Sequence, residues 1–551
     1  MSSLLVSYQL FRGLSAKISA GYTMLTMNEV STVPVNSVDP AYGVTTGFAS
    51  FADNTIHTWI AEPQLEYKRD IGKGKLTMLV GTTFQQNTQS GRSLYAFGFV
   101  NDALLENIGA ASSVDVVSSS VTDYKYSAVF SRITYDLGER YLFNLTARRD
   151  GSSRFGPDKQ FANFGAAGIG WIFSKEKIIA KKIPSLSFGK IRLSYGTTGN
   201  DQIGDYQYLN SYVSTSYPYQ GVSGLYPSRL FNPDYSWEIN KKLETGLDLG
   251  FFHDKILISG NYYRNRSSSQ LVGYPLAPTT GFSSVQSNLA AVVQNAGMEF
   301  TVNTINIKTK DFIWKMSLNL TIPRNKLIAY PGLQNSSYAT TYVIGKPLSV
   351  VQKFHYTGVD PITGVYTFED INKDGQITYP EDLTAFKSIT QNYYGGLENI
   401  VEYGGLQLAV FFQFIKQSGK NYLYNSFSAP GFFGNQPDVV LGRWQKPGDK
   451  TNVQQFTESY SSPAYNAFAS SQYEGDNAIS DASFIRLKNI SLSYRFPPSV
   501  LQRLRVAGLQ VFLHGQNLLT LTHYIGLDPQ NQSPGFLPPL RELTAGIQLT
   551  L

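Results

Sequence analysis

Apolar and polar positions alternate with a period of two along much of this chain. Three clear stretches are 59–70 (WIAEPQLEYKRD), 140–150 (RYLFNLTARRD) and 311–321 (DFIWKMSLNLT). The alternation returns in 507–521 and in the last ten residues, 542–551. Because successive side chains of a β-strand point to opposite faces, the pattern predicts strands with one apolar and one polar face. Stretches of about ten residues suit tilted membrane strands better than the roughly five or six residues of soluble sheets.

The connections between these stretches alternate between short and long. The predicted tight turns lie at 11–13, 69–75, 135–141, 251–255, 306–311 and 402–405. The predicted long connections lie near 25–56, 88–122, 199–235, 265–290, 323–390, 418–481 and 522–540. Soluble domains rarely carry so many long loops, whereas outer-membrane barrels have short periplasmic turns and long extracellular loops. We therefore predict an all-β protein, a transmembrane antiparallel β-barrel with about 17 strands in this chain.

Composition supports a membrane barrel and narrows the possible functions. Only 16% of the 551 residues are charged, against about a quarter in soluble domains, and 14% are aromatic. The net charge of +6 is the difference between 46 basic and 40 acidic residues, so no nucleic-acid partner is expected. The chain has no cysteine, which excludes disulfides and zinc–thiolate sites. A soluble propeller or a tandem of sandwiches is disfavoured because no repeat of about 40–50 residues is found.

Residues 370–381, DINKDGQITYPE, match the spacing of a calcium loop. Such a loop takes oxygen ligands from positions 1, 3, 5, 7 and 12, and a glycine at position 6 permits the sharp turn. The predicted Ca²⁺ ligands are Asp370, Asn372, Asp374, Gln376 and Glu381. The flanking segments do not form EF-hand helices, so the ion would be structural and weakly bound, with a Kd on the order of 10⁻⁴–10⁻³ M. The alternative is an acidic hydrophilic turn without an ion.

Aromatic residues are the candidates for substrate contact. Tyr217, Tyr219 and Tyr226 lie in a long connection and could stack on a substrate. Four tryptophans are expected in the aromatic girdles of a barrel, where their rings lie at the level of the lipid headgroups. They are Trp59, Trp171, Trp237 and Trp314. The basic stretch 175–184 is expected to form a short solvated helix.

No catalytic motif supports an enzyme. The five histidines are widely separated, and the chain has no HExxH, GxSxG or phosphate-binding glycine loop. Asp528 and Glu542 near the C-terminus have no partner that the sequence can assign.

Five stretches, in order along nearly the whole chain, resemble the SusC/RagA family of TonB-linked outer-membrane transporters. They are 148–171 (RRDGSSRFGPDKQFANFGAAGIGW), 190–208 (KIRLSYGTTGNDQIGDYQY), 231–252, 258–272 and 481–497. The resemblance implies a 22-stranded barrel that imports glycans, oligosaccharides or peptides. It also implies a SusD/RagB-like surface lipoprotein as partner, outer-membrane lipid around the barrel, and energy from the TonB complex.

Residues 1–551 resemble only the C-terminal barrel part of that family. The family's signal peptide, N-terminal extension and plug domain have no counterpart here, so the sequence suggests a truncated or split-gene product that would contact TonB through the missing N-terminal part. An incomplete sheet leaves unsatisfied N–H and C=O groups in hydrocarbon, each worth several kcal/mol, and would need strands from another polypeptide. The alternatives are a passive porin-like or non-functional barrel remnant and a surface carbohydrate-binding β-protein.

Overall fold

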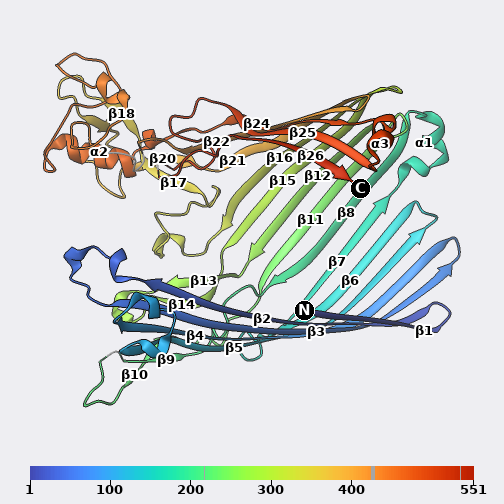
Figure 1. Ribbon diagram of the computed structural model, residues 1–551, viewed down its shortest axis with the longest axis horizontal. Coiled ribbons are helices and arrows are strands. Elements are labelled where there is room, and N and C mark those ends of the chain that lie inside the picture. The colour runs from blue at the N-terminus through green and yellow to red at the C-terminus, as the bar shows by residue number, and fades with distance from the viewer. Residues whose placement is uncertain (216, 424–427, 534) are drawn as a thin grey trace. The chain divides into compact units, whose positions relative to one another are not determined.

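The computed structural model describes residues 1–215, 217–423, 428–533 and 535–551. Positions 216, 424–427 and 534 fall in the predicted long connections and lie outside the described residues. Strands dominate the described part, and its three α-helices are short (Figure 1). They are α1 (Lys177–Lys182), α2 (Pro463–Tyr473) and α3 (Pro498–Leu504). None of these described helices has the length and apolar character needed to cross a membrane.

Eighteen of the described strands belong to one large sheet. Its first eight are β1 (Ser2–Phe11), β2 (Leu14–Val33), β3 (Gly47–Ile71), β4 (Gly74–Phe99), β5 (Ser113–Leu137), β6 (Tyr141–Ser152), β7 (Phe161–Trp171) and β8 (Leu186–Asn200). The others are β11 (Glu238–Phe251), β12 (Ile256–Ser268), β15 (Val292–Lys308), β16 (Phe312–Ala329), β21 (Gln391–Tyr403), β22 (Leu406–Lys420), β23 (Ile479–Asp481), β24 (Phe484–Arg495), β25 (Gly508–Thr522) and β26 (Glu542–Thr550). Apart from the three-residue β23, this agrees with the predicted count.

Four two-stranded ribbons occupy the long connections. They are β9 (Ser211–Ser214) with β10 (Leu225–Arg229), β13 (Gln270–Pro275) with β14 (Ser284–Leu289), β17 (Val350–Phe354) with β20 (Leu383–Ser388), and β18 (Tyr356–Val359) with β19 (Tyr366–Phe368). The chain divides into two compact units. Unit 1 contains residues 1–171, 193–242 and 267–290, and unit 2 contains residues 172–192, 243–266 and 291–551.

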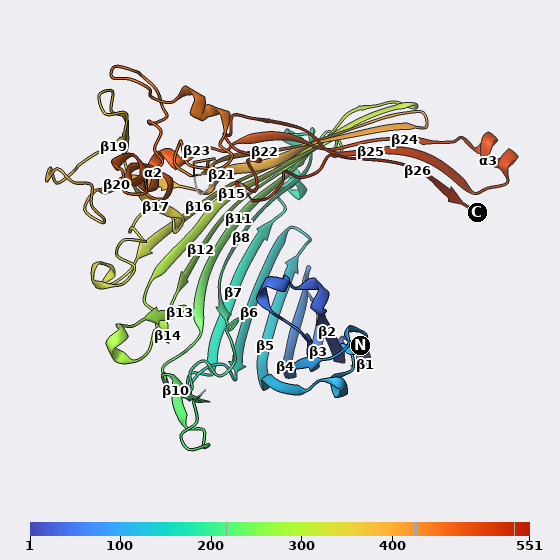
Figure 2. The ribbon, with the colours of Figure 1, turned by 60° about the vertical axis from the view of Figure 1, so that its left-hand side comes forward.

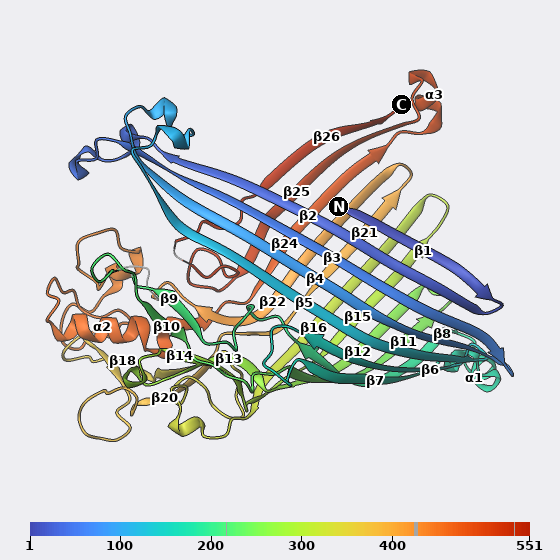
Figure 3. The ribbon, with the colours of Figure 1, turned by 90° about the horizontal axis from the view of Figure 1, so that it is seen from below.

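Unit 1 is built around an antiparallel meander in which each strand from β1 to β7 pairs with the next. Figure 3 shows its long strands β2 to β5 side by side. The turn between β1 and β2 requires Gly13, which has a φ of +90°. A Cβ there would lie 2.4 Å from the carbonyl oxygen of Lys68. The predicted tight turns are confirmed at this position and at the five others.

The two faces of the unit 1 sheet differ in chemistry. Leu65 on β3 pairs with Ala16 on β2 and with Val80 on β4, which places the three side chains on one face. Leu65 and Val80 are about half exposed, at 49% and 52%. The neighbouring positions Gln64 and Glu66 point to the other face, which is polar. An exposed apolar face opposite a polar face is the reverse of a soluble sheet and is the arrangement of a membrane barrel.

Unit 2 continues the same construction and carries the longest loops. Its strands β15, β16, β21, β22, β24, β25 and β26 pair in that order, all antiparallel. Figure 2 shows α2, β17 and β20 gathered beyond the ends of β16, β21 and β22. The basic stretch forms the short helix α1, as predicted.

Two predicted long connections are mostly strand. β2 and β3 remain paired up to Val33 and Phe48, and β4 and β5 remain paired up to Phe97 and Ser113. The connections near 25–56 and 88–122 are therefore only about a dozen residues long. The prediction was wrong there because it required strict alternation of apolar and polar positions. A backbone ladder needs only hydrogen bonds, and these strands continue where that alternation is lost.

Candidate functional site

The predicted calcium loop lies in unit 2, between β19 and β20. Asp370 accepts hydrogen bonds through Oδ1 from the backbone N–H of Lys373 (2.7 Å) and through Oδ2 from that of Gly375 (2.8 Å). Asn372 Oδ1 accepts from the N–H of Asp374 at 3.1 Å. The side chains of Asp370, Asn372 and Asp374 thus line one tight turn, and their oxygens bind backbone amides of that turn.

Asp382, which the sequence did not single out, closes this loop. Its side chain is fully buried, and it accepts hydrogen bonds from the N–H groups of Ile371 and Thr378, both at 2.8 Å. The bond from Thr378 and then that from Ile371 lower the pKa of Asp382. Among the described residues, no group of three or more acidic or histidine side chains converges as an ion site. The loop therefore closes through Asp382 without using Glu381, and calcium binding stays a prediction.

The candidate substrate tyrosines lie on the β9–β10 ribbon of unit 1. Tyr217 and Tyr219 are near its tip and are 90% and 80% exposed. Tyr226 is on β10, paired with Val213, and is about half exposed. All three rings are accessible to a ligand, and their role stays a prediction.

Residues of the first two family-like stretches meet on unit 1 around Arg154. Its Nε donates to Asp205 Oδ1 at 2.8 Å, and its Nη1 donates to the backbone oxygen of Asp201 at 3.0 Å. The guanidinium lies 4.1 Å from the centroid of the Tyr124 ring, and the Tyr124 hydroxyl donates to Asp201 Oδ2 at 2.7 Å. The sequence showed that these stretches are family-like but not that they meet, because Arg154 and Asp205 are 51 positions apart.

A second charged group lies on the polar face of unit 1. Arg148 Nε donates to both carboxylate oxygens of Asp150 at 2.8 Å, and its Nη2 donates to the hydroxyl of Tyr126 at 2.7 Å. Charge-assisted contacts of this kind hold side chains in fixed positions. These contacts hold the side chains of Arg148, Asp150 and Tyr126 in place on the polar face.

Beside these groups, four aromatic residues form a buried cluster. They are Phe155, Phe164, Tyr235 and Trp237. Trp237 is only 6% exposed, and its Nε1 donates to the backbone oxygen of Gln160 at 2.8 Å. The girdle prediction is therefore wrong for Trp237, which follows a loop and packs inside it. Trp59 and Trp171 lie exposed on strands, as a girdle position requires.

Asp528 has a partner that the sequence could not assign. Its Oδ2 accepts from Nη2 of Arg486 at 2.5 Å, and both side chains are buried. Arg486 also donates to Thr520 (2.9 Å) and to Gln530 (2.9 Å). The loop before β26 is thereby fixed to β24 and β25 in unit 2.

The long loops of unit 2 form a small packed assembly of their own. Five buried residues make its core: Tyr366, Leu423, Ala429, Phe468 and Ala478. Asp476 joins two of the loops, since it accepts from the N–H of Tyr356 at 2.9 Å and lies 3.2 Å from both His355 Nδ1 and Lys387 Nζ. Burial acts to raise the pKa of Asp476, but the contacts with Tyr356, His355 and Lys387 outweigh it, and the pKa is lowered.

Comparison with known proteins identifies the family. The family model described as "TonB dependent receptor-like, beta-barrel" matches residues 3–518. The chain belongs to this family. The predicted SusC/RagA resemblance and the barrel fold are thereby confirmed. The family consists of receptors and transporters, and membership places the chain in the bacterial outer membrane.

Individual relatives cover nearly the whole chain. TonB-dependent receptor P3 of Formosa agariphila is 27% identical over 557 residues, which cover 95% of this chain and 54% of that protein. TonB-dependent receptor SusC of Bacteroides thetaiotaomicron is 29% identical over 429 residues, which cover 73% of this chain and 41% of SusC. The RagAB peptide transporter structure matches with a TM-score of 0.85 and 26% identity, covering 98% of this chain and 60% of that chain. The chain spans about half the length of the curated relatives it matches.

Proposed function

We propose that this chain forms the wall and outer loops of an importer that carries oligosaccharides or peptides across the outer membrane. The transport is energised through the TonB complex and assisted by a SusD/RagB-like surface lipoprotein. The observation that carries the proposal is the match over 98% of the chain to the RagAB peptide transporter. The polar face of the unit 1 strands supports a water-filled interior, and the role is transport and not catalysis.

The loop assembly of unit 2 supports the proposed lipoprotein partner. It has its own buried core, so it offers a preformed surface. Large apolar side chains remain exposed on it, among them Phe433, Leu441 and Tyr460. Exposed apolar groups on an ordered loop surface are typical of protein interfaces.

Uptake in the producing bacterium tests the transport role. Deletion of the gene is expected to abolish uptake of either a labelled oligosaccharide mixture or a labelled peptide mixture, and the intact gene is expected to restore it. A protonophore is expected to block the restored uptake, because TonB-dependent transport requires the proton gradient. Uptake that continues with the protonophore would indicate a passive pore. Unchanged uptake of both mixtures in the deletion strain would favour a remnant or a surface-binding protein.

Affinity purification tests the partner. The chain extracted in mild detergent is expected to retain a surface lipoprotein, and the variant Phe433→Ala/Leu441→Ala is expected to retain much less. Tyr217→Ala/Tyr219→Ala, equally exposed but on the β9–β10 ribbon, serves as the control. If both variants retain the lipoprotein equally well, Phe433 and Leu441 of the unit 2 loops are not part of the interface.

We also propose that loop 370–381 takes a structural Ca²⁺ ion. Three oxygen-bearing side chains, those of Asp370, Asn372 and Asp374, line one turn of the loop, and oxygen donors suit this cation. Gln376 would add its backbone carbonyl and Glu381 its carboxylate. Calcium titration of the purified chain is expected to show weak binding that Asp374→Ala removes, whereas Asp438→Ala leaves it unchanged. Identical titrations of wild type and Asp374→Ala would refute the site.

A further inference from the structure

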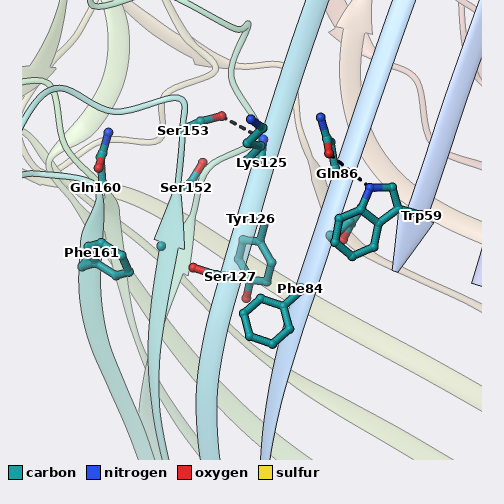
Figure 4. Close-up of a pocket in the computed structure, with 12 residues that line it drawn as sticks. Trp59, Phe84, Gln86, Lys125, Tyr126, Ser127, Ser152, Ser153, Gln160 and Phe161 are labelled. Atoms are coloured by element: carbon teal, nitrogen blue, oxygen red, sulfur yellow. Dashed lines mark hydrogen bonds between the residues drawn. The ribbon is translucent and has the colours of Figure 1, made fainter. Parts of the chain in front are cut away.

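A pocket opens on the apolar face of unit 1, beside the loop ends of β6 and β7 and the middle of β3, β4 and β5 (Figure 4). Its volume is about 320 Å³. The strand register explains it. One row of paired residues crosses four neighbouring strands on the same face: Phe84 on β4, Ser127 on β5, Gly151 on β6 and Phe161 on β7. The two small residues lie between the two phenylalanines and leave a slot between the rings.

The next row toward the loops is aromatic and polar. Trp59 pairs with Gln86, which pairs with Lys125. The Trp59 Nε1 donates to Gln86 Oε1 at 3.1 Å, which holds the indole at the edge of the pocket. Figure 4 shows Trp59, Phe84 and Phe161 around the slot, with Lys125 toward its upper end.

Glycine at position 151 is required for this shape. A Cβ on Gly151 would lie 2.4 Å from Cε1 of Phe161. The Phe161 ring therefore packs directly on the backbone of β6 and forms one wall of the slot. Any larger residue at position 151 would displace the ring.

The pocket lies at one edge of the membrane-facing band. At the turn end of β6, Tyr141 pairs with Trp171 of β7 on the apolar face, which marks the opposite edge. Arg149 lies on the same face, eight positions along β6 from Tyr141. At about 3.3 Å per residue and a tilt of about 40°, this is about 20 Å, close to the roughly 25 Å apolar band of a barrel. Because the long loops of such barrels are extracellular, the pocket faces the outer leaflet.

Two cations flank the slot. Arg149, one row below it, lies 5.4 Å from the centroid of the Phe161 ring, and its Nη1 donates to Asn163 Oδ1 at 3.2 Å. Lys125, one row above it, lies 3.3 Å from Asp123 Oδ2. The other Asp123 oxygen accepts from Gln86 (2.7 Å). Each cation retains donors for a further acceptor, since a guanidinium has five N–H groups and an ammonium three.

We propose that this pocket binds the phosphorylated sugar headgroup of an outer-leaflet glycolipid. Phe84, Phe161 and Trp59 would contact the sugar faces, and Lys125 and Arg149 would bind phosphate. The acyl chains would lie along the apolar face below, over Val129 and Leu145. An anionic lipid fits because the site has two cations and one acid. A glycolipid fits better than a lipid without a sugar, because the sugar ring would fill the slot between the two phenylalanine rings. The inference rests on the barrel family and not on the proposed transport.

Lipid retention measured by native mass spectrometry tests the site. The full chain is produced in outer membranes, extracted in mild detergent and incubated with bis-phosphorylated lipid A as the probe. The wild type is expected to retain lipid A. The double variant Lys125→Gln/Arg149→Gln is expected to retain at least about tenfold less, because each Lys or Arg near an anionic lipid surface contributes about 1 kcal/mol of binding free energy. Ser127→Leu fills the slot without changing charge and is expected to reduce retention as well.

The control is Arg132→Gln, which removes a cation from the opposite face of β5. It is expected to retain lipid A like the wild type. Equal retention by all variants would overturn the proposal, as would equal binding of phosphatidylglycerol or of dephosphorylated lipid A. Displacement of lipid A by inorganic phosphate alone would indicate a site for free anions. A measured mass of two chains without lipid would indicate that a second copy of this chain covers the pocket. Either result would overturn the proposal. Heat-modifiable migration verifies that each variant is folded, and a fold failure in one variant leaves the other to decide.

Discussion

At the residue scale, the clearest pair of buried opposite charges among the described residues is Arg486 with Asp528. Desolvating two charges is expensive, and only close, fully hydrogen-bonded geometry offsets it. Arg486 meets this condition with contacts to Asp528, Gln530 and Thr520. A buried pair of this kind favours one arrangement of the chain over others, because burying either charge without its partner is strongly unfavourable.

Asp528→Ala is expected to lower the unfolding free energy by about 3–5 kcal/mol, because the guanidinium of Arg486 stays buried without its partner. Thermal loss of heat-modifiable migration measures the effect. Asp53→Ala, which breaks the exposed pair with Arg92, is the matched control and is expected to change stability by about 1 kcal/mol or less. Asp528→Leu combined with Arg486→Met is expected to recover much of the loss. Equal effects of the two single substitutions would show that burial of the pair is unimportant.

Close packing at Gly199 gives a second prediction. A Cβ there would lie 2.2 Å from Cζ of Phe164 and 2.6 Å from Cε3 of Trp237. Gly199→Ala is therefore expected to destabilise the buried aromatic cluster by about 1–3 kcal/mol, the usual range for overpacking. Gly168→Ala on β7 is the control, since its Cβ would meet no atom closer than 3.7 Å. Near-ultraviolet circular dichroism and the melting temperature are measured for both variants. Equal changes in the two variants would contradict the packing argument.

At the scale of elements, a buried carboxylate joins two of the long loops of unit 2, in addition to their shared apolar core. Asp476 bridges the segment around β17 to β20 and the segment that follows α2. Its contacts with a backbone amide, a histidine and a lysine are stronger for the ionised form. The packing of these loops therefore depends in part on a group that titrates.

A lowered carboxyl pKa sets the direction of the pH dependence. The pKa of Asp476 is lower in the folded state, so its stabilisation is complete above the ordinary value of about 4 and is lost as pH falls through the lowered value. Hydrogen exchange in residues 354–388 is expected to accelerate below about pH 4. Asp476→Asn is expected to show fast exchange already at pH 7, with little further change in acid. The exposed Asp438→Asn is the control, and a similar response from it would argue against the bridge.

At the scale of the whole molecule, the family and the exposed apolar face make the protein a membrane barrel wall. We expect the chain to remain in the outer-membrane fraction after an alkaline wash and to migrate faster on gels when it is not heated. Both properties follow from a backbone whose hydrogen bonds are protected by lipid. Leu65→Arg, in the middle of the apolar face, is expected to reduce the folded fraction, because Arg near the bilayer midplane costs about 2–4 kcal/mol. Gln64→Arg, which changes the polar face, is the control and should fold normally.

The sequence by itself determined the strands, the tight turns and the barrel class. Each of these depends on local features: a period of two, short polar turns, and motifs such as residues 148–171. It mispredicted the loops near 25–56 and 88–122 because strand pairing continues there without strict alternation of apolar and polar positions. It also placed Trp237 in a girdle, because nothing local shows that a loop will cover that ring.

Only the tertiary structure decided which distant residues meet. Asp528 pairs with Arg486 across 42 positions, Arg154 with Asp205 across 51, and Asp476 with His355 across 121. The pocket on unit 1 likewise exists because the register aligns Ser127 and Gly151 between two phenylalanines from other strands. Side-chain alternation follows from the backbone of one strand, whereas these contacts follow from register and loop closure, which no single stretch of sequence encodes.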